Sequence, residues 1–206
     1  MFIATIPVIS YVYVFVKLYI SVFSELSTFY TYMLYILAIL SMSLGVFGAL
    51  VQRRIKRLIA YSSISTIGYI IAGISGDSIL LTQQSLLYLF IYIINIVPLF
   101  IIILNYRINN VQCLDSIRQF TALYSQNAFF FSILCLFLFS LAGVPPLAGF
   151  FGKLLLFTSF GSEAMFMILF ISISFTLIGC YYYIRIIKMV LYDKKKNNYF
   201  FATTSY

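Results

Sequence analysis

Six apolar stretches, each close to the length of a membrane span, constrain this chain more than any other feature of its sequence. A helix needs about 20 apolar residues to cross the hydrocarbon core of a bilayer, where its backbone must satisfy its own hydrogen bonds. The apolar runs predict helices at roughly 3–23, 29–50, 57–75, 80–104, 126–157 and 164–191. We therefore expect an all-α integral membrane protein with a single transmembrane domain, 1–191, and a polar C-terminal tail, 192–206.

The composition supports a membrane protein and narrows its chemistry. Of the 206 residues 63% are hydrophobic and 9% are charged, whereas about a quarter of the residues of a soluble domain are charged. There is no histidine, and the three cysteines lie far apart, so the usual metal and haem ligand sets are missing. We expect no cofactor bound by this chain. The net charge of +8 is interpreted as a topology signal and not as a nucleic-acid surface.

The charges separate into two groups along the chain. If six helices alternate in direction, the connections at 51–56 and 105–125 and the tail lie on one side of the membrane. Eleven of the thirteen basic residues are at or near that side: Arg53, Arg54, Lys56, Arg57, Arg107, Arg118, Arg185, Lys188, Lys194, Lys195 and Lys196. The opposite turns carry Glu25, Asp77 and Glu163 and no basic residue. The positive-inside rule then predicts that the basic side is the matrix or cytoplasmic side.

The two remaining basic residues, Lys17 and Lys153, lie inside predicted helices. A lysine near the centre of a span costs about 2.5–3.5 kcal/mol on insertion scales, so it is rarely kept without a partner, a cavity or a function. Lys17 is about four residues, or ~6 Å, from the middle of its span, so snorkelling to the interface is the alternative explanation.

Lys153 follows a predicted break in its helix. Pro145 and Pro146 remove two backbone donors, and neighbouring glycines permit unwinding or close approach. Broken helices are tolerated in membranes where they line a polar cavity, and they recur at the ion sites of transporters. This position predicts a proton-relay lysine, with a proline kink and a lysine buried by packing as the alternative.

A third set of polar residues lies where a basic loop enters the helix at 57–75. Its members are Lys56, Arg57, Tyr61, Ser62 and Ser63. They either anchor the topology and bond to backbone groups, or position an entry route from the basic side. Asn95 and Pro98 in the fourth span are interpreted as packing residues that bend the helix or bond across helices.

Three segments, in this order, resemble the antiporter-like subunits of respiratory complex I. They are 55–69, IKRLIAYSSISTIGY; 140–153, SLAGVPPLAGFFGK; and 179–185, GCYYYIR. The aromatic run of the third segment is most similar to the subunit 2 branch of that family. The resemblance implies the second half of an antiporter-like inverted-repeat fold, with one helix broken at Pro145-Pro146.

The resemblance also implies roles for individual residues. Lys153 corresponds to the lysine of the broken helix in the second half of the fold. Pro7 followed by Lys17 resembles the helix that carries the central lysine of the family. Both lysines would then belong to a hydrated polar axis along which protons move. FMN, iron–sulfur clusters and ubiquinone would be bound by other subunits of the complex.

The chain also departs from the family. Full-length members have a first half with a glutamate and a lysine on additional helices, for which we expect a separate chain. Thr66 stands where relatives often have histidine. The other expected partners are membrane-arm subunits and lipids. The 22 Phe and 18 Tyr fit an AT-rich genome, so the expected location is the mitochondrial inner membrane, with basic loops and C-terminus in the matrix.

Three functions stay open. The first is a proton-translocating membrane-arm subunit of an NADH:ubiquinone reductase, in which buried lysines and waters relay protons and the chain itself holds no redox site. The second is a subunit of a cation/proton antiporter. The third is a structural remnant that fills the membrane arm without pumping.

Overall fold

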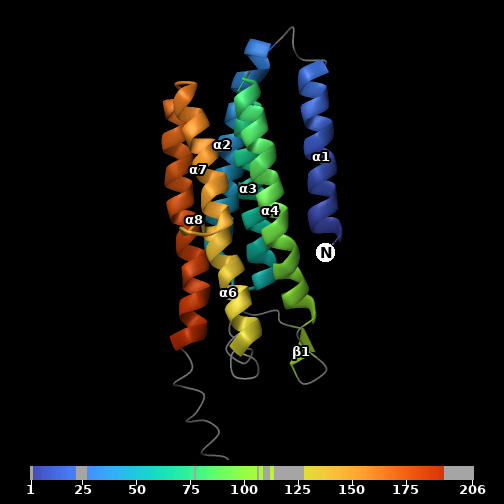
Figure 1. Ribbon diagram of the computed structural model, residues 1–206, viewed down its shortest axis with the longest axis vertical. Helices are drawn as coiled ribbons and strands as arrows, with labels where there is room; N and C mark the ends of the chain where they lie inside the picture. Colours follow the sequence, from blue (N-terminus) through green and yellow to red (C-terminus); the bar gives the residue numbers. More distant parts are fainter. Residues whose placement is uncertain are drawn as a thin grey trace, which may run out of the picture.

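The computed structural model describes residues 2–21, 27–76, 78–105, 107–108, 112–113 and 128–192. These residues form seven helices in one elongated bundle, with α1 at one edge and α7 and α8 at the other (Figure 1). The helices are α1 (Phe2–Ser21), α2 (Ser27–Val51), α3 (Ile55–Ile74), α4 (Ile79–Asn105), α6 (Ala128–Ala142), α7 (Ala148–Ser162) and α8 (Phe166–Tyr192).

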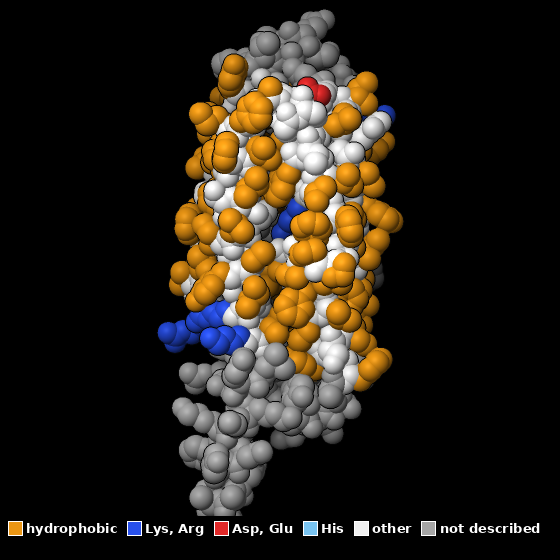
Figure 2. Space-filling model, turned by 60° about the vertical axis from the view of Figure 1, so that its left-hand side comes forward, with side chains coloured by type: hydrophobic (Ala, Val, Ile, Leu, Met, Phe, Trp, Pro, Cys, Tyr) orange, Lys and Arg blue, Asp and Glu red, His pale blue; other side chains and the backbone are white. Residues whose placement is uncertain are grey.

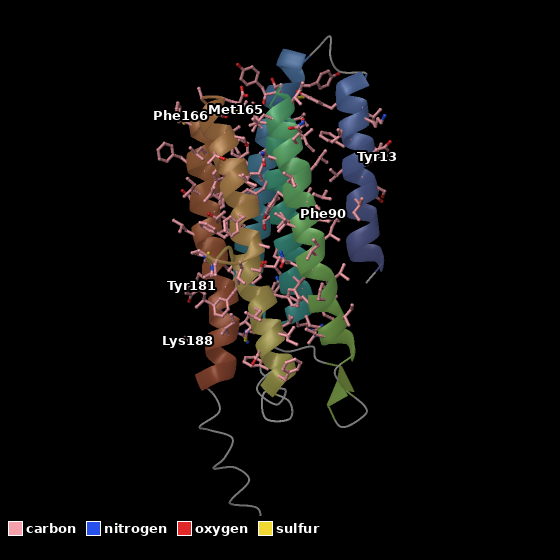
Figure 3. All side chains as sticks on the ribbon, in the orientation of Figure 1. Tyr13, Phe90, Met165, Phe166, Tyr181 and Lys188 are labelled. Carbon is pink, nitrogen blue, oxygen red and sulfur yellow. The ribbon has the colours of Figure 1, made fainter. Side chains whose placement is uncertain are left out.

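Four helices, α2, α3, α4 and α8, are long and apolar enough to cross a membrane, whereas α1 and α6 hold shorter apolar stretches. The outer surface of the bundle is apolar, as a lipid-facing surface must be (Figure 2). Tyr13, Phe166 and Tyr181 illustrate it, because each is more than half exposed and points away from the bundle (Figure 3). The architecture is that of a multi-pass membrane protein, and the count of six spans stays a prediction.

Most helix ends lie within two residues of the predicted ends. The fifth predicted span, 126–157, corresponds to α6 and α7 with the predicted break between them, and it differs only in that α7 continues to Ser162. The predicted end of this span, at residue 157, is therefore wrong. Its hydroxyl residues do not break the helix because Thr158, Ser159 and Ser162 each donate to the carbonyl three residues earlier.

The prediction of an all-α chain needs one small correction. The connection after α4 contains a two-stranded antiparallel ladder, β1 (Arg107–Ile108) with β2 (Gln112–Cys113), in which Arg107 pairs with Cys113. The tail and most of the 105–125 connection lie outside the described residues.

Close packing of α2 against α3 depends on glycines. A Cβ added at Gly45 would come within 2.5 Å of the Ser65 backbone nitrogen, and one at Gly68 within 2.9 Å of the Met42 backbone nitrogen. Small residues at such contacts let two membrane helices approach until their backbones nearly touch, which increases van der Waals contact where no hydrophobic driving force exists. The two helices consequently form a closely packed pair.

We expect Gly45→Ala to destabilise this pair by about 1–3 kcal/mol, because the added methyl meets backbone that cannot move aside. The measurement is the thermal denaturation midpoint of the detergent-solubilised protein. Gly179→Ala is the matched control, since its Cβ would meet nothing closer than the Tyr182 hydroxyl at 3.7 Å. Equal midpoints for the two variants would contradict the conclusion that the packing of α2 against α3 depends on glycine.

Two apolar clusters fill the bundle at different heights. One lies toward the start of α3 and the ends of α4 and α8, and includes Ile59, Leu99 and Ile186. The other lies toward the end of α3 and the start of α4 and α8, and includes Ile70, Leu81 and Phe160. The break between α6 and α7 lies at mid-height between the two ends of the bundle (Figure 1).

Except for Lys153, the described charged side chains lie toward the ends of the bundle. Arg53, Arg54 and Arg57 at the start of α3, and Arg185 and Lys188 near the end of α8, are exposed. Figure 2 shows a large blue group at the lower end and, near the upper end, a red group, the colour of Asp and Glu, with a small area of blue at the right edge. Most of the exposed basic side chains therefore lie at the end opposite to Glu163, which agrees with the alternating direction of the helices.

Candidate functional site

Helix α6 ends in the middle of the bundle because the chain turns at Gly143. Gly143 has φ +85, a backbone conformation that glycine adopts without the strain other residues would have. The amide groups of Gly143 and Val144 both donate to the Phe139 carbonyl at 3.1 Å, which closes the last turn of α6. Pro145 and Pro146 follow, joined by a cis peptide bond, and neither has an N–H with which to extend the helix.

Helix α7 begins in contact with the end of α6. Its N-cap residue, Leu147, makes no side-chain cap, but the Gly149 N–H donates to Ser140 Oγ at 3.1 Å. A Cβ at Gly149 would overlap the Ser140 carbonyl oxygen, so only glycine permits this approach. The broken helix is thus held as a compact joint and is not a loose kink.

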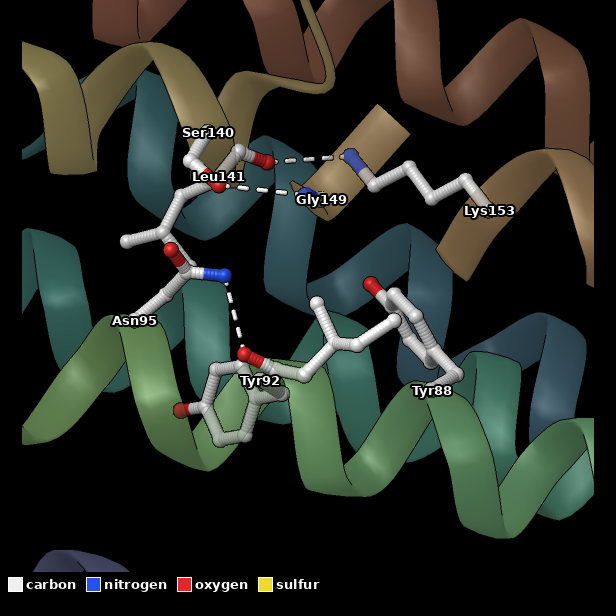
Figure 4. Close-up of a pocket in the computed structure, with 8 residues that line it drawn as sticks. Tyr88, Tyr92, Asn95, Ser140, Leu141, Gly149 and Lys153 are labelled. Carbon is white, nitrogen blue, oxygen red and sulfur yellow. Dashed lines mark hydrogen bonds between the residues drawn. The ribbon is translucent and has the colours of Figure 1, made fainter. Parts of the chain in front are cut away.

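Lys153, in the second turn of α7, bonds this helix to the end of α6. Its Nζ donates to the Leu141 carbonyl at 3.0 Å (Figure 4). It also donates to the Ala142 carbonyl at 3.3 Å. These are the last carbonyls of α6, at the negative end of its dipole. Hydrogen bonds of a charged group are worth about 1.5–3 kcal/mol each, comparable with the cost of placing a lysine in a membrane. The half-buried ammonium is therefore stabilised without a carboxylate.

The inner side of Lys153 borders a small pocket. Its lining consists of Tyr88, Ile91, Tyr92 and Asn95 from α4, Ser140 and Leu141 from α6, and Gly149 and Lys153 from α7. Tyr88, Asn95 and Ser140 are almost fully buried. Helix α7 comes close to α4 here because Gly152 packs on the Tyr88 ring. The polar groups of three helices meet at this one point.

The outer side of Lys153 borders a larger groove of about 440 Å³ between α7 and α8. Its walls are mainly apolar, with Phe150, Phe157 and Leu177 among the lining residues. Figure 2 shows blue atoms in a hollow of the apolar surface at mid-height. Cys180 also lines the groove and donates to the Ala142 carbonyl at 2.9 Å, so α8 binds the same helix end as Lys153.

The other predicted site residues lie elsewhere. Lys17 is on an exposed face of α1, four residues before the end of the helix, with its Nζ 6.0 Å from the centre of the Tyr13 ring. It lines neither of the two cavities that contain Lys153. The structure does not bring the two lysines together within the described residues.

The residues at the start of α3 are also outside the Lys153 pocket. Lys56 is half-buried, and the Tyr61 ring packs where a side chain at Gly48 would lie. The hydroxyls of Ser62 and Ser63 donate to the carbonyls of Ile59 and Ala60 in their own helix. Pro145 and Pro146 are both exposed, lie between α6 and α7, and line neither of the two cavities that contain Lys153.

Sequence reasoning missed the polar residues of the pocket other than Lys153. Asn95 was interpreted as a packing residue, and Tyr88 and Ser140 were given no role at all. The available signal was a polar amide in an otherwise apolar span, which is expensive unless it bonds. Asn95 Nδ2 donates to the Ile91 carbonyl at 2.8 Å, which leaves its Oδ1 as an acceptor (Figure 4). Within the described ranges no cluster of His, Cys, Asp or Glu suits a metal ion.

Curated relatives match most of this chain. NADH-quinone oxidoreductase subunit N 1 of Rhizobium meliloti is 32% identical over 198 residues, 96% of this chain and 41% of the relative. Subunit N of a Wolbachia from Brugia malayi is 41% identical over 81% of this chain and 35% of its own length. The chloroplastic NAD(P)H-quinone oxidoreductase subunit 2 of Chaetosphaeridium globosum is 36% identical, over 88% and 36%. The chain thus spans about two fifths of the length of these relatives.

Solved structures show the same fold. A chain of respiratory complex I from Thermus thermophilus superposes with a TM-score of 0.65 at 28% identity, over 77% of this chain and 35% of that chain. A chain of the Mrp complex from a Dietzia species gives a TM-score of 0.70 at 18% identity, over 85% and 32%, which shows the fold alone.

The family model described as NADH:quinone oxidoreductase/Mrp antiporter, transmembrane, matches residues 1–179, a stretch that includes the broken helix and Lys153. The chain belongs to this family of antiporter-like membrane proteins.

Proposed function

We propose that this chain is part of a proton-translocating, antiporter-like subunit of the membrane arm of a mitochondrial NADH:ubiquinone oxidoreductase. The observation that carries the proposal is Lys153, an ammonium at mid-height in an apolar bundle, bonded to the open carbonyl end of a broken helix. The curated relatives are NADH-quinone oxidoreductase subunits, which supports the choice of complex.

The chemistry of Lys153 suits a proton carrier. Its partners are two neutral backbone carbonyls, so the side chain is bound in both its charged and its neutral form, and more tightly when charged. Redox steps on other subunits would supply the driving force, and FMN, iron–sulfur clusters and ubiquinone would be bound there.

A cation/proton antiporter is the second candidate function. It is favoured by the superposition on a chain of the Mrp complex and by a family that includes both kinds of protein. The two candidates differ in partners, because only the first requires an NADH-oxidising assembly. The non-pumping remnant is the third candidate, and it is separated from the first by the Lys153 variants described in the Discussion.

We expect the chain to migrate with a large NADH-oxidising assembly when mildly solubilised membranes are separated by native electrophoresis. Mass spectrometry of that band would identify the membrane-arm partners and would test whether a separate chain carries the counterpart of the first half. Migration with antiporter subunits alone, in a band that does not oxidise NADH, would exclude the complex I proposal and support the second candidate.

Lys17 stays a proposed second relay residue. In this role its exposed side chain on α1 would be covered by a neighbouring polypeptide, because a charged side chain in contact with lipid is costly. We expect Lys17→Ala to lower proton translocation in the assembled complex. Unchanged translocation would show that Lys17 snorkels to the interface and takes no part in the relay.

A further inference from the structure

The residues that line the inner pocket beside Lys153 carry more hydrogen-bond donors and acceptors than the hydrogen bonds described above use. Lys153 has three N–H donors, and the described carbonyls of Leu141 and Ala142 receive two of them. Ser140 Oγ accepts from Gly149, which leaves its own O–H to donate. Asn95 Oδ1 is an acceptor, and the Tyr88 hydroxyl points from α4 toward the side on which Lys153 lies (Figure 4).

The size of the pocket selects the group that these donors and acceptors fit. The centre of a water-sized sphere has about 10 Å³ in which to move, the room that one buried water needs. A buried water typically makes about three hydrogen bonds, and the lining offers both donors and acceptors. A larger ligand or a hydrated cation does not fit in this volume.

Lys153 also needs a proton partner that the backbone cannot supply. Amide carbonyls accept a hydrogen bond but do not carry a proton onward. Glu163 is the one carboxylate among the described side chains, and it lies exposed at the other end of α7, ten residues away. A water or a hydroxyl is therefore the group that can exchange a proton with Nζ at this place.

We propose that Tyr88, Asn95 and Ser140 bind a single water and that this water is the immediate proton-exchange partner of Lys153. The inference rests on the proposed function of the chain as a proton carrier and assigns three further residues to it. Ser140 and Asn95 position the water, and Tyr88 is the next group in line.

The transfer conserves atoms and charge. The N–H bond of Lys153 breaks as an O–H bond forms on the water. The same water gives one of its original hydrogens to the Tyr88 hydroxyl oxygen, whose own hydrogen passes to a hydroxyl or water beyond it. Lysine is left neutral, the water and Tyr88 are chemically unchanged, and one proton has moved. The reverse sequence charges the lysine.

The test uses the assembled NADH-oxidising complex in membrane vesicles, with protons moved per NADH oxidised as the readout. Asn95→Leu removes the amide at similar volume, and Tyr88→Phe removes one hydroxyl. We expect each to lower the ratio to the level of Lys153→Met, because all three interrupt the same step. Assembly, measured by native electrophoresis, should not change.

Tyr69→Phe is the matched control. Tyr69 is buried like Tyr88, and its hydroxyl donates to the Ser172 carbonyl at 3.3 Å, outside the pocket. Its ratio should equal that of the unmodified complex. If Asn95→Leu and Tyr88→Phe match this control while Lys153→Met lowers the ratio, the water site is wrong and the proposed function stands. If Lys153→Met also matches the control, the proposed function itself fails.

A direct measurement covers variants that do not assemble. An electron cryomicroscopy map of the unmodified complex that resolves ordered waters should show one density within hydrogen-bonding distance of Lys153 Nζ and Ser140 Oγ. A well-resolved pocket without that density would overturn the proposal whatever the variants do.

Discussion

If the chain is the proposed pump subunit, replacing Lys153 with methionine is expected to remove its share of the protons pumped per NADH, while the complex still assembles. Methionine keeps most of the apolar stem and fills the same space, but it cannot carry a proton. The ammonium costs about 2.5–3.5 kcal/mol in the membrane, so its removal offsets the loss of two hydrogen bonds to α6. The measurement is proton translocation by vesicles, normalised to NADH oxidation and to the amount of assembled complex.

Lys153→Arg separates charge from proton exchange. Arginine keeps the positive charge at the end of α6 but cannot release its proton in a protein. We expect this variant to assemble and to pump as poorly as Lys153→Met. Normal pumping by Lys153→Arg would mean that a fixed charge is enough and that Lys153 is not a carrier. Normal pumping by both variants would favour the non-pumping remnant.

Gly149→Ala is expected to give the largest loss of stability, about 3 kcal/mol or more. A Cβ at this position would overlap the Ser140 carbonyl oxygen. Hydrogen bonds of Ser140, Lys153 and Cys180 hold the backbone of this region in place, so it cannot easily move aside. Separation of α6 from α7 would also remove the Gly149 hydrogen bond to Ser140. We expect a strong decrease in the amount of assembled complex and in its thermal denaturation midpoint.

Gly161→Ala, in the same helix, is the control for this effect. Nothing lies within 4 Å of a Cβ at Gly161, and alanine favours a helix by up to about 1 kcal/mol over glycine. The control should be neutral or slightly more stable than the unmodified protein. If Gly149→Ala behaved in the same way, the tight joint between α6 and α7 would be wrong.

The sequence was sufficient to predict the helices, because a long apolar stretch is a strong indication of a membrane-spanning helix. Apolar length gave most helix ends within two residues, and Pro145-Pro146 predicted the break between α6 and α7. The predicted end of the fifth span was wrong because Thr158 and Ser159 are polar and suggest a turn exposed to water. Inside a helix their hydroxyls bond back to the chain and cost little.

The composition of the Lys153 pocket was much harder to predict. A sequence shows that Lys153 follows a helix break, but it does not show which helix packs against that break. Asn95 and Tyr88 lie about 60 residues earlier in the chain and reach Lys153 because Gly152 lets α7 approach α4. Such tertiary pairing depends on the contacts of single small residues, which one sequence without an alignment does not reveal.

The position of Lys153 between two apolar clusters has an electrical consequence. Apolar protein does not conduct, so the voltage across the membrane falls over these clusters, and a proton that reaches mid-height has crossed about half of it. A full crossing is worth about 2.3 kcal/mol per 100 mV, so a half crossing is worth ~1.2 kcal/mol. At about 100 mV that energy changes the ratio of protonated to neutral lysine by most of a factor of ten. An energised membrane would thus oppose or assist the loading of Lys153, depending on the face from which its proton arrives.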